Sequence, residues 1–276
     1  MIESRVETIT PELATQYLSR NRKNRTIRKR DVEAYAREIR RGTFQLTHQG
    51  IAFDAEDNLI DGQHRLMAIA MAGQPVQMMV TRGIPAATMK SIDRGAGRTM
   101  RDVMVLSDSG GADVTRASKN TIMISAMSQL VEHGLKRVNL TTTEIIDLFA
   151  AFKDEVDTVF NTAVNKKGIG RSQILSAAIA AMHAGVDKEA IEKFFRVFLR
   201  SDIRDCDDYN VQVVLNWRKQ IDDAKLQGMA MNKRRVYIGT QNAIHHFVNN
   251  TQTTRINANA QLKYDVSATL KSVLGM

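Results

Sequence analysis

The sequence predicts an α+β fold, with a small mixed-sheet domain at residues 1–110 followed by an all-helical domain at residues 111–276. Up to about residue 110, short apolar runs typical of strands alternate with apolar residues at helical spacing. Beyond that point only the helical spacing recurs. The clearest linker, Ser-Asp-Ser-Gly-Gly at residues 107–111, lies between the two patterns and gives the predicted domain boundary.

The N-terminal domain begins with a predicted strand and two predicted helices. Residues 2–9 alternate between apolar and polar types, which is typical of a strand. Thr-Pro-Glu at residues 10–12 supplies an N-cap, a first-turn proline and a first-turn acid, so a helix is expected from there to about Ser19. A second helix is expected over residues 32–39, where apolar side chains recur at helical spacing, and Gly42 ends it.

The rest of this domain alternates between strands and a helix. Strands are predicted at residues 51–53 and 59–60, with a polar turn at residues 54–58 between them. A helix follows residue 65, and a further strand is predicted at residues 76–80.

The second half of the chain has helical patterns only. Thr141 and Glu144 have the spacing of a capping box, which predicts a helix from there to Phe152. Further amphipathic helices are predicted over residues 171–183, 187–200 and 208–226.

The composition limits the function classes. A net charge of +9 favours anionic partners such as nucleic acid, nucleotides or a membrane surface. The single cysteine, Cys206, excludes a disulfide framework or a cysteine-based zinc site within one chain, and the six histidines lack the spacing of a metal pair, so no metal site is predicted. Because the chain lacks a membrane-length apolar run and a signal-peptide core, we expect a cytoplasmic location and no membrane partner.

The polar run Asp-Gly-Gln-His-Arg at residues 61–65 is the main candidate site. It lies where a predicted strand meets a helix, and amides at a helix N-terminus attract anions. Gly62 lets a ligand approach the backbone, while Arg65 offers a forked, permanently charged donor. Asp61 could orient His64 or Arg65, hold a metal ion, or accept a proton. The alternative is a surface turn with an incidental ion pair.

Two basic segments are candidate DNA contacts. Residues 20–30 carry seven basic side chains, and residues 228–264 contain no acid and five basic side chains. Clustered cations suit a phosphate backbone, although both segments could equally be solvated surface. The residues predicted to contact DNA are Arg22, Lys23, Arg28, Lys29, Arg30, Lys233, Arg234 and Arg235.

Residues 61–68 resemble the signature of the ParB/sulfiredoxin-like superfamily. Its partition proteins carry a G-x-R-R-x-x-A box that binds the triphosphate of CTP; Gly62, Arg65 and Ala68 match it, and His64 replaces its first arginine. Sulfiredoxins carry G-C-H-R at this place, and because Gln63 replaces the reactive cysteine, their chemistry is not expected here. Free serine kinases of the superfamily carry D-G-x-x-R with an aspartate implicated in catalysis, and Asp61 fits that form.

A nearer resemblance is to uncharacterised ParB-like proteins of phages and mobile elements, and it covers roughly residues 5–110. Those proteins share N-x-x-N-R, I-x-F-D, D-G-Q-H-R-L and D-x-G-x-x-R motifs in this order. The matching residues here are Asn21 with Asn24 and Arg25, Ile51 with Phe53 and Asp54, the run from Asp61, and Asp93 with Gly95 and Arg98. The resemblance implies a phage or mobile-element origin and locates Arg25 near the site. Arg98 lies in a glycine- and arginine-rich segment that also suits phosphate.

Three functions follow as hypotheses. The first is a nucleotide-responsive DNA-binding protein, with CTP or ATP and magnesium held by the residues Arg25, Gly62, Gln63, His64, Arg65 and Arg98. The second is a phosphotransferase or nucleotide hydrolase with Asp61 and His64 as catalytic residues. The third is a phage protein that acts on a host protein. A homodimer is a further possible assembly.

Overall fold

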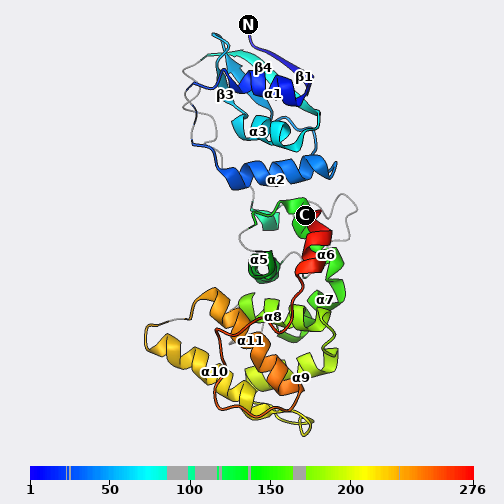
Figure 1. The fold of residues 1–276 in the computed structure, drawn as a ribbon, viewed down its shortest axis with the longest axis vertical. Coiled ribbons are helices and arrows are strands. Elements are labelled where there is room, and N and C mark those ends of the chain that lie inside the picture. Colours follow the sequence, from blue (N-terminus) through cyan, green and yellow to red (C-terminus); the bar gives the residue numbers. More distant parts are fainter. Residues whose placement is uncertain are drawn as a thin grey trace. The chain divides into compact units, whose positions relative to one another are not determined.

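The computed structural model describes residues 1–22, 24, 26–85, 99–102, 117, 120–135, 138–163, 172–229 and 231–276. Contacts within the chain divide it into two compact units. The first consists mainly of residues 1–97, and the second contains most of the remaining chain. The predicted α+β class is confirmed, since a four-stranded mixed sheet near the N-terminus is followed by helices (Figure 1). The predicted linker at residues 107–111 lies outside the described residues.

The sheet of the first unit has the strand order β1-β4-β2-β3. Strand β1 (Glu3–Ile9) pairs antiparallel with β4 (Val76–Ile84), which pairs parallel with β2 (Ile51–Asp54). Strand β3 (Leu59–Asp61) then pairs antiparallel with β2. The alternation of residues 2–9 therefore belongs to an edge strand, and β4 extends four residues beyond its predicted end at Val80.

The described residues 1–85 of this unit form three helices: α1 (Pro11–Leu18), α2 (Lys29–Arg40) and α3 (Gln63–Ala72). The Thr10 hydroxyl accepts the N–H of Leu13 at 3.2 Å, so the predicted N-cap of α1 is confirmed. The helices and the sheet share one core. Its buried residues are Ile9, Ala14, Tyr17, Val32, Ala36, Ile39, Ile51, Phe53, Leu59, Leu66, Ala68, Ile69, Met78 and Val80.

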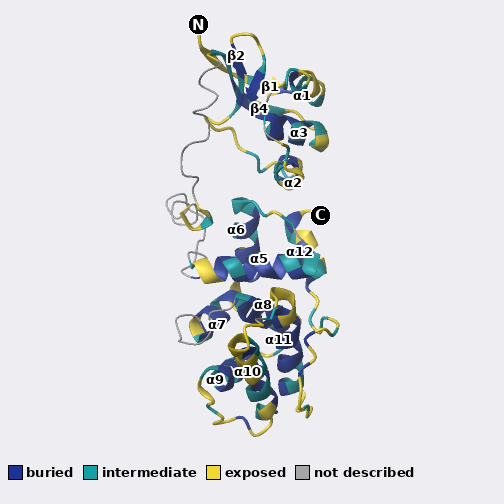
Figure 2. Ribbon diagram, turned by 90° about the vertical axis from the view of Figure 1, so that its left-hand side faces the viewer, coloured by how far each residue is buried: buried dark blue, intermediate teal, exposed yellow. Residues whose placement is uncertain are grey.

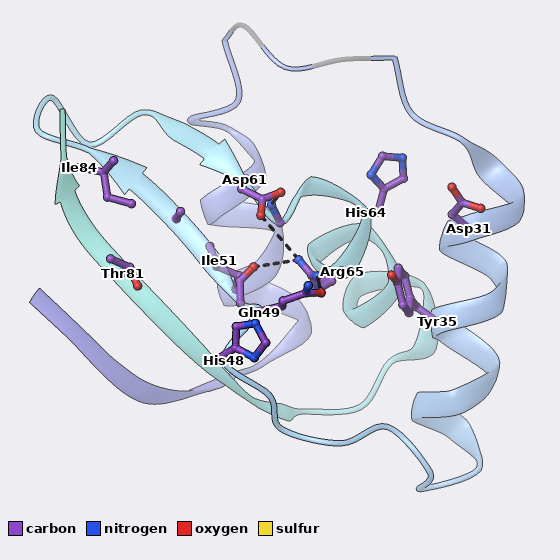
Figure 3. Close-up of a pocket in the computed structure, with 13 residues that line it drawn as sticks. Asp31, Tyr35, His48, Gln49, Ile51, Asp61, His64, Arg65, Thr81 and Ile84 are labelled. Atoms are coloured by element: carbon purple, nitrogen blue, oxygen red, sulfur yellow. Dashed lines mark hydrogen bonds and ion pairs between the residues drawn. The ribbon is translucent and has the colours of Figure 1, made fainter. Parts of the chain in front are cut away.

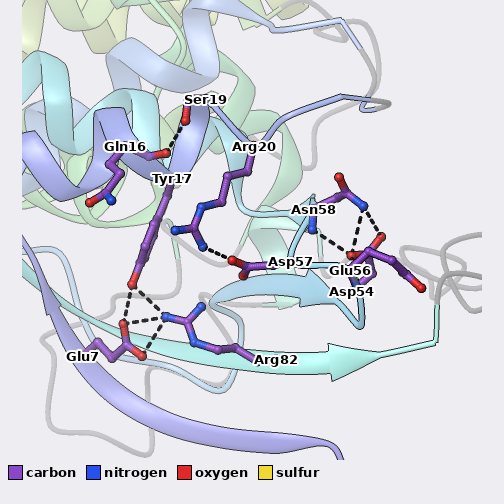
Figure 4. A network of polar contacts seen from close by, with 10 residues as sticks. All are labelled: Glu7, Gln16, Tyr17, Ser19, Arg20, Asp54, Glu56, Asp57, Asn58 and Arg82. Carbon is purple, nitrogen blue, oxygen red and sulfur yellow. Dashed lines mark hydrogen bonds and ion pairs between the residues drawn. The ribbon is translucent and has the colours of Figure 1, made fainter.

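A polar network joins β1, α1 and β4 at one side of this core (Figure 4). Tyr17 donates its hydroxyl to Glu7 at 2.8 Å, and Arg82 donates to Glu7 at 3.0 Å and to the Tyr17 hydroxyl at 2.7 Å. The Arg82 guanidinium also lies over the Phe53 ring, 4.9 Å from its centroid. Burial raises the pKa of Glu7, but the hydrogen bonds from Arg5 and Tyr17 and the charge of Arg82 outweigh burial, so its pKa is lowered. Glu7 is therefore ionised and fixes β1 to β4.

In the second unit, all the regular secondary structure of the described residues is helical. Its helices are α5 (Thr121–Leu135), α6 (Thr142–Ala151), α7 (Lys153–Ala163), α8 (Ser172–His183), α9 (Lys188–Arg200), α10 (Val211–Leu226), α11 (Lys233–Val248) and α12 (Ser267–Leu274). Helix α8 is buried over the whole of residues 173–181 and contacts α5, α7, α9 and α11 (Figure 2). A helix buried on all sides is the centre of its bundle, which explains the unbroken apolar and small residues of α8.

Helix α11 buries residues that look available for DNA in the sequence. The carboxamide of Gln241 accepts the N–H groups of Lys263 and Tyr264 and donates to the Tyr264 carbonyl at 3.0 Å. Asn242 donates to the carbonyl of Ile238 within the helix. The Gln241 amide therefore fixes the chain after α11, and neither of these two amides is available to DNA, whereas the basic residues of the first turn of α11 are exposed.

His133 is a buried imidazole within the second unit. It is 6% exposed, its ring lies 4.5 Å from that of Tyr237, and its Nε2 has no hydrogen-bond partner among the described residues. Burial lowers the pKa of His133 to about 4; Glu132 opposes this shift, and Arg234 and Lys233 add to it. The folded chain therefore keeps this imidazole neutral where an unfolded chain would protonate it.

This difference predicts a pH-dependent stability. Between about pH 6.5 and pH 4 the unfolded state binds a proton at His133 that the folded state does not, so the free energy of unfolding falls as the pH falls. Urea unfolding at pH 7 and pH 5 should show wild-type protein losing about 1–2 kcal/mol more than His133→Phe. Because all other groups titrate in both proteins, an equal loss in the two would contradict the assignment.

Candidate functional site

The residues Asp61 to Arg65 span a strand end, one junction residue and the first turn of a helix. Asp61 ends β3, Gly62 is the N-cap of α3, and Gln63 begins the helix. The expected five-residue loop is thus much shorter, and helix α3 starts earlier than residue 66. Asp61 Oδ1 accepts the N–H of Gly62 at 2.7 Å, and no side chain caps α3. A helix start of this kind exposes partial positive charge.

Two glycines let this junction lie against the neighbouring strands. Gly62 has a φ of 95°, and a Cβ there would lie 3.0 Å from both the Gly50 carbonyl oxygen and the Ile51 Cα. A Cβ at Gly50 would lie 1.8 Å from the carbonyl oxygen of Met79 on β4. Both positions therefore require glycine, because backbone atoms occupy the space of a side chain.

Arg65 extends from the first turn of α3 across this contact (Figure 3). Its Nη1 donates to the Gly50 carbonyl at 3.0 Å and its Nη2 donates to Gln49 Oε1 at 3.2 Å. Nη1 also lies 3.9 Å from Asp61 Oδ2, at the limit of an ion pair. The Arg65 side chain is 16% exposed and lines a cavity, so its guanidinium is held in position and accessible.

The cavity has a volume of about 310 Å³ and lies wholly within the first unit. Its charged walls are the carboxylates of Asp31 and Asp61 and the guanidinium of Arg65. The described residues that line it are Asp31, Tyr35, His48, Gln49, Gly50, Ile51, Ala52, Asp61, Gly62, His64, Arg65, Thr81 and Ile84. The prediction from sequence did not include Asp31, Tyr35, His48 or Gln49. No local pattern marks them, because α2 and the segment before β2 bring them to the cavity through the tertiary fold.

His64 joins the cavity to the basic segment. The side chain is buried at 8% exposure and lines the cavity. Its Nε2 accepts the backbone N–H of Arg28 at 3.0 Å, and Arg28 is the N-cap of α2. A nitrogen that accepts an N–H bond carries no proton, so this hydrogen bond fixes the tautomer of the imidazole and the start of α2.

The Gln63 side chain is buried and hydrogen-bonded within the protein, and it does not line the cavity. It is 4% exposed, and its Oε1 accepts from Asn21 Nδ2 at 3.0 Å. Asn24 Nδ2 donates to Asn21 Oδ1 and to the Leu59 carbonyl, both at 2.7 Å. The two asparagines of the N-x-x-N motif therefore attach the segment before α2 to the β3–α3 junction, and the Gln63 side chain is part of that attachment instead of the expected phosphate site.

Asp54, the acid of the I-x-F-D motif, shapes the turn between β2 and β3 (Figure 4). Its Oδ1 accepts the backbone N–H groups of Glu56 at 3.0 Å and Asn58 at 2.7 Å. Burial raises the pKa of Asp54, but the hydrogen bonds from Asn58 and Glu56 outweigh it, so the pKa is lowered. Asp54 does not line the cavity. Among the described residues, the cavity carboxylate besides Asp61 is Asp31.

The predicted cationic residues divide into exposed residues and residues outside the described chain. Lys23, Arg25 and Arg98 lie outside the described residues, as do Asp93 and Gly95. The exposed predicted DNA contacts are Arg22, Arg28, Lys29, Arg30, Lys233, Arg234 and Arg235. The last three form the first turn of α11, where Asn232 Oδ1 caps the helix by accepting the N–H of Arg235 at 2.9 Å.

Cys206 carries a thiol, a group that can act as a nucleophile, but this side chain is buried and unsuited to nucleophilic chemistry. Burial raises the pKa of its thiol; Arg196 and Lys193 lower it, and Asp202 and Asp205 raise it further. A reactive cysteine needs a lowered pKa, so Cys206 is not a candidate nucleophile.

The glycine requirement at the junction predicts that a glycine-to-alanine substitution costs more stability at the start of α3 than at its end. Gly62→Ala and Gly73→Ala both place a side chain at positive φ, but only Gly62 has backbone atoms where the Cβ would go, since nothing lies within 4 Å at Gly73. Gly73→Ala should cost about 1–2 kcal/mol in the free energy of unfolding, and Gly62→Ala a further 1–3 kcal/mol or so. Urea unfolding measures both; equal losses would show that the junction has room for a side chain.

The comparisons with known proteins identify no related protein for this chain. No family model, curated protein or solved structure matches the chain. Within the described ranges, no three histidine, cysteine, aspartate or glutamate side chains are grouped so that they could hold a metal ion. None of the described helices is long and apolar enough to cross a membrane.

Proposed function

We propose that the chain is a ParB-like protein that binds a nucleoside triphosphate in the Arg65 cavity and binds DNA through its exposed basic residues. The cavity carries this proposal, because a held guanidinium faces it beside the start of a helix. A planar, forked donor at a helix N-terminus is the arrangement that recognises phosphate oxygens. The volume of about 310 Å³ is at the lower end of small-molecule sites.

The carboxylates of the cavity determine whether a nucleotide would bind as a bare triphosphate or as its magnesium complex. Asp31 and Asp61 would repel a bare triphosphate, and Arg65 alone does not balance both. Magnesium is usually bound by one or two carboxylates together with substrate phosphates, so it would convert this repulsion into attraction. We therefore propose CTP or ATP as the magnesium complex, with Asp61 as the carboxylate nearest to Arg65.

The contact between His64 and Arg28 supports a nucleotide response in DNA binding. His64 lines the cavity and its Nε2 holds the backbone of Arg28. Arg28, Lys29 and Arg30 are exposed at the start of α2. A ligand that moves the imidazole would therefore move the start of α2 and the direction of these cations.

The proposal includes a homodimer and a cytoplasmic location.

Calorimetric titration with each nucleoside triphosphate and magnesium tests the binding half of the proposal. Arg65→Ala should weaken the preferred nucleotide about ten- to hundredfold, the effect of losing charge-assisted hydrogen bonds to phosphate. Arg40→Ala is the matched control, because Arg40 is exposed, makes one hydrogen bond to the Met71 carbonyl at 3.1 Å and does not line the cavity. A wild-type chain that binds no nucleotide, or an Arg65→Ala chain that binds as well as wild type, would rule the site out.

The exposure of Asp61 favours a second function, phosphoryl transfer or nucleotide hydrolysis. Its side chain is 35% exposed at the cavity, with one carboxylate oxygen bonded to Gly62 N–H and the other facing Arg65. An ionised carboxylate in this position could orient or deprotonate an attacking hydroxyl.

Asp61→Asn separates this enzyme from a binding protein. If Asp61 is catalytic, the variant should lose magnesium-dependent phosphate release by at least about a hundredfold while calorimetry still detects nucleotide binding. Wild-type protein that binds nucleotide without turnover would leave binding as the function and dismiss the enzyme.

A further inference from the structure

A second concave surface, here called the α10–α11 groove, lies in the helical unit. It has a volume of about 560 Å³. Three cationic side chains line it, Lys219, Arg235 and Arg255, together with one acid, Asp223. The other lining residues are Asn216, Gln220, Ala224, Gln227, Met229, Met231 and Thr254.

Three separate stretches of the chain build the groove. Lys219 belongs to α10, Arg235 to the first turn of α11, and Arg255 to the segment that follows α11. Asn216 Nδ2 donates to the Thr254 carbonyl at 3.4 Å and so attaches that last segment to α10. The cations therefore converge through the tertiary fold, which the sequence pattern alone does not reveal.

The groove has a positive charge that its surroundings do not neutralise. Lys219, Arg235 and Arg255 are exposed, and none of them takes part in an ion pair within the part of the chain that the structure describes. Residues 228–264 contain no acid. The start of α11, at Arg235, adds the positive end of a helix of 16 residues. An anion is therefore the ligand that this surface favours.

Gln220 adds an amide to the lining of the groove but not a contact for a ligand. Its Nε2 is buried without a hydrogen-bond partner among the described residues, so it is enclosed by the protein and does not face the open groove. The case for an anionic ligand therefore rests on the three converging cations, Lys219, Arg235 and Arg255.

We propose that the α10–α11 groove binds the phosphate backbone of DNA. Its walls are exposed side chains, as at Asp223, Gln227 and Met229, which suits a polymer lying along the surface more than an enclosed metabolite. None of the described residues that line the groove is aromatic, so the groove offers phosphate contacts, which are independent of sequence, and no base stacking. This inference rests on the DNA-binding half of the proposed function and is independent of the nucleotide cavity.

Fluorescence anisotropy with a short labelled DNA duplex, at several salt concentrations, tests the inference on the full chain. The double variant Lys219→Ala/Arg255→Ala should weaken DNA binding at least about tenfold at moderate salt and reduce the slope of log K against log salt by about two. The matched control is Lys188→Ala/Arg204→Ala. It removes the same charges from exposed sites of the helical unit outside the groove, where Lys188 lies 4.0 Å from Glu192 and Arg204 lies 2.8 Å from Asp202.

The possible outcomes distinguish a failure of the groove proposal from a failure of the proposed function. Weaker binding and a lower slope in the groove variant alone support the groove. Wild-type affinity in the groove variant, or equal losses in both double variants, overturns the groove and leaves DNA binding to the basic segment of residues 20–30. A wild-type chain that does not bind DNA even at low salt overturns both the groove and the DNA half of the proposed function. The nucleotide half is then decided by the calorimetry of Arg65→Ala.

Discussion

The close approach of backbone to backbone at Gly50 and Gly62 is the constraint on which the candidate site depends. With the carbonyl of Met79 where a Cβ of Gly50 would be, β2 and β4 converge at the point where α3 begins. This contact leaves the Gly50 carbonyl within reach of Arg65, which holds the guanidinium at the cavity. The same junction starts α3, from which His64 lines the cavity and Gln63 bonds to Asn21.

Much of the fold was predictable because its signals are local. Thr10 caps α1 and alternation marks β1, since both features depend on neighbours along the chain. The roles of side chains at the site were less predictable. Gln63 stands between two residues that line the cavity, yet its amide accepts from Asn21 forty-two positions earlier. Polarity in a sequence does not distinguish a ligand contact from a buried hydrogen bond, and the same ambiguity applies to Gln241 on α11.

The two units have surfaces of different electrostatic character, and each suits a different ligand. In the first unit, carboxylates and one guanidinium share a small cavity, which fits a compact ligand whose charge is partly balanced by a cation. In the second, three cations and a single acid lie along an open groove, which fits an extended polyanion. The net charge of +9 gives only the sum of these patterns, so composition indicates an anionic partner without locating its contacts.

The described residues between α1 and α2 have no regular secondary structure, yet they are anchored at three positions. Asn21 is bonded to Gln63, Asn24 to the Leu59 carbonyl, and the backbone of Arg28 to His64. The conformational entropy of the anchored residues is therefore given up during folding and not during association. A polyanion that meets these residues finds them already arranged, so more of each contact contributes to affinity. Under the proposed DNA binding, the anchored residues of this segment would therefore act as a preorganised recognition element, although the composition of residues 20–30 is that of a mobile loop.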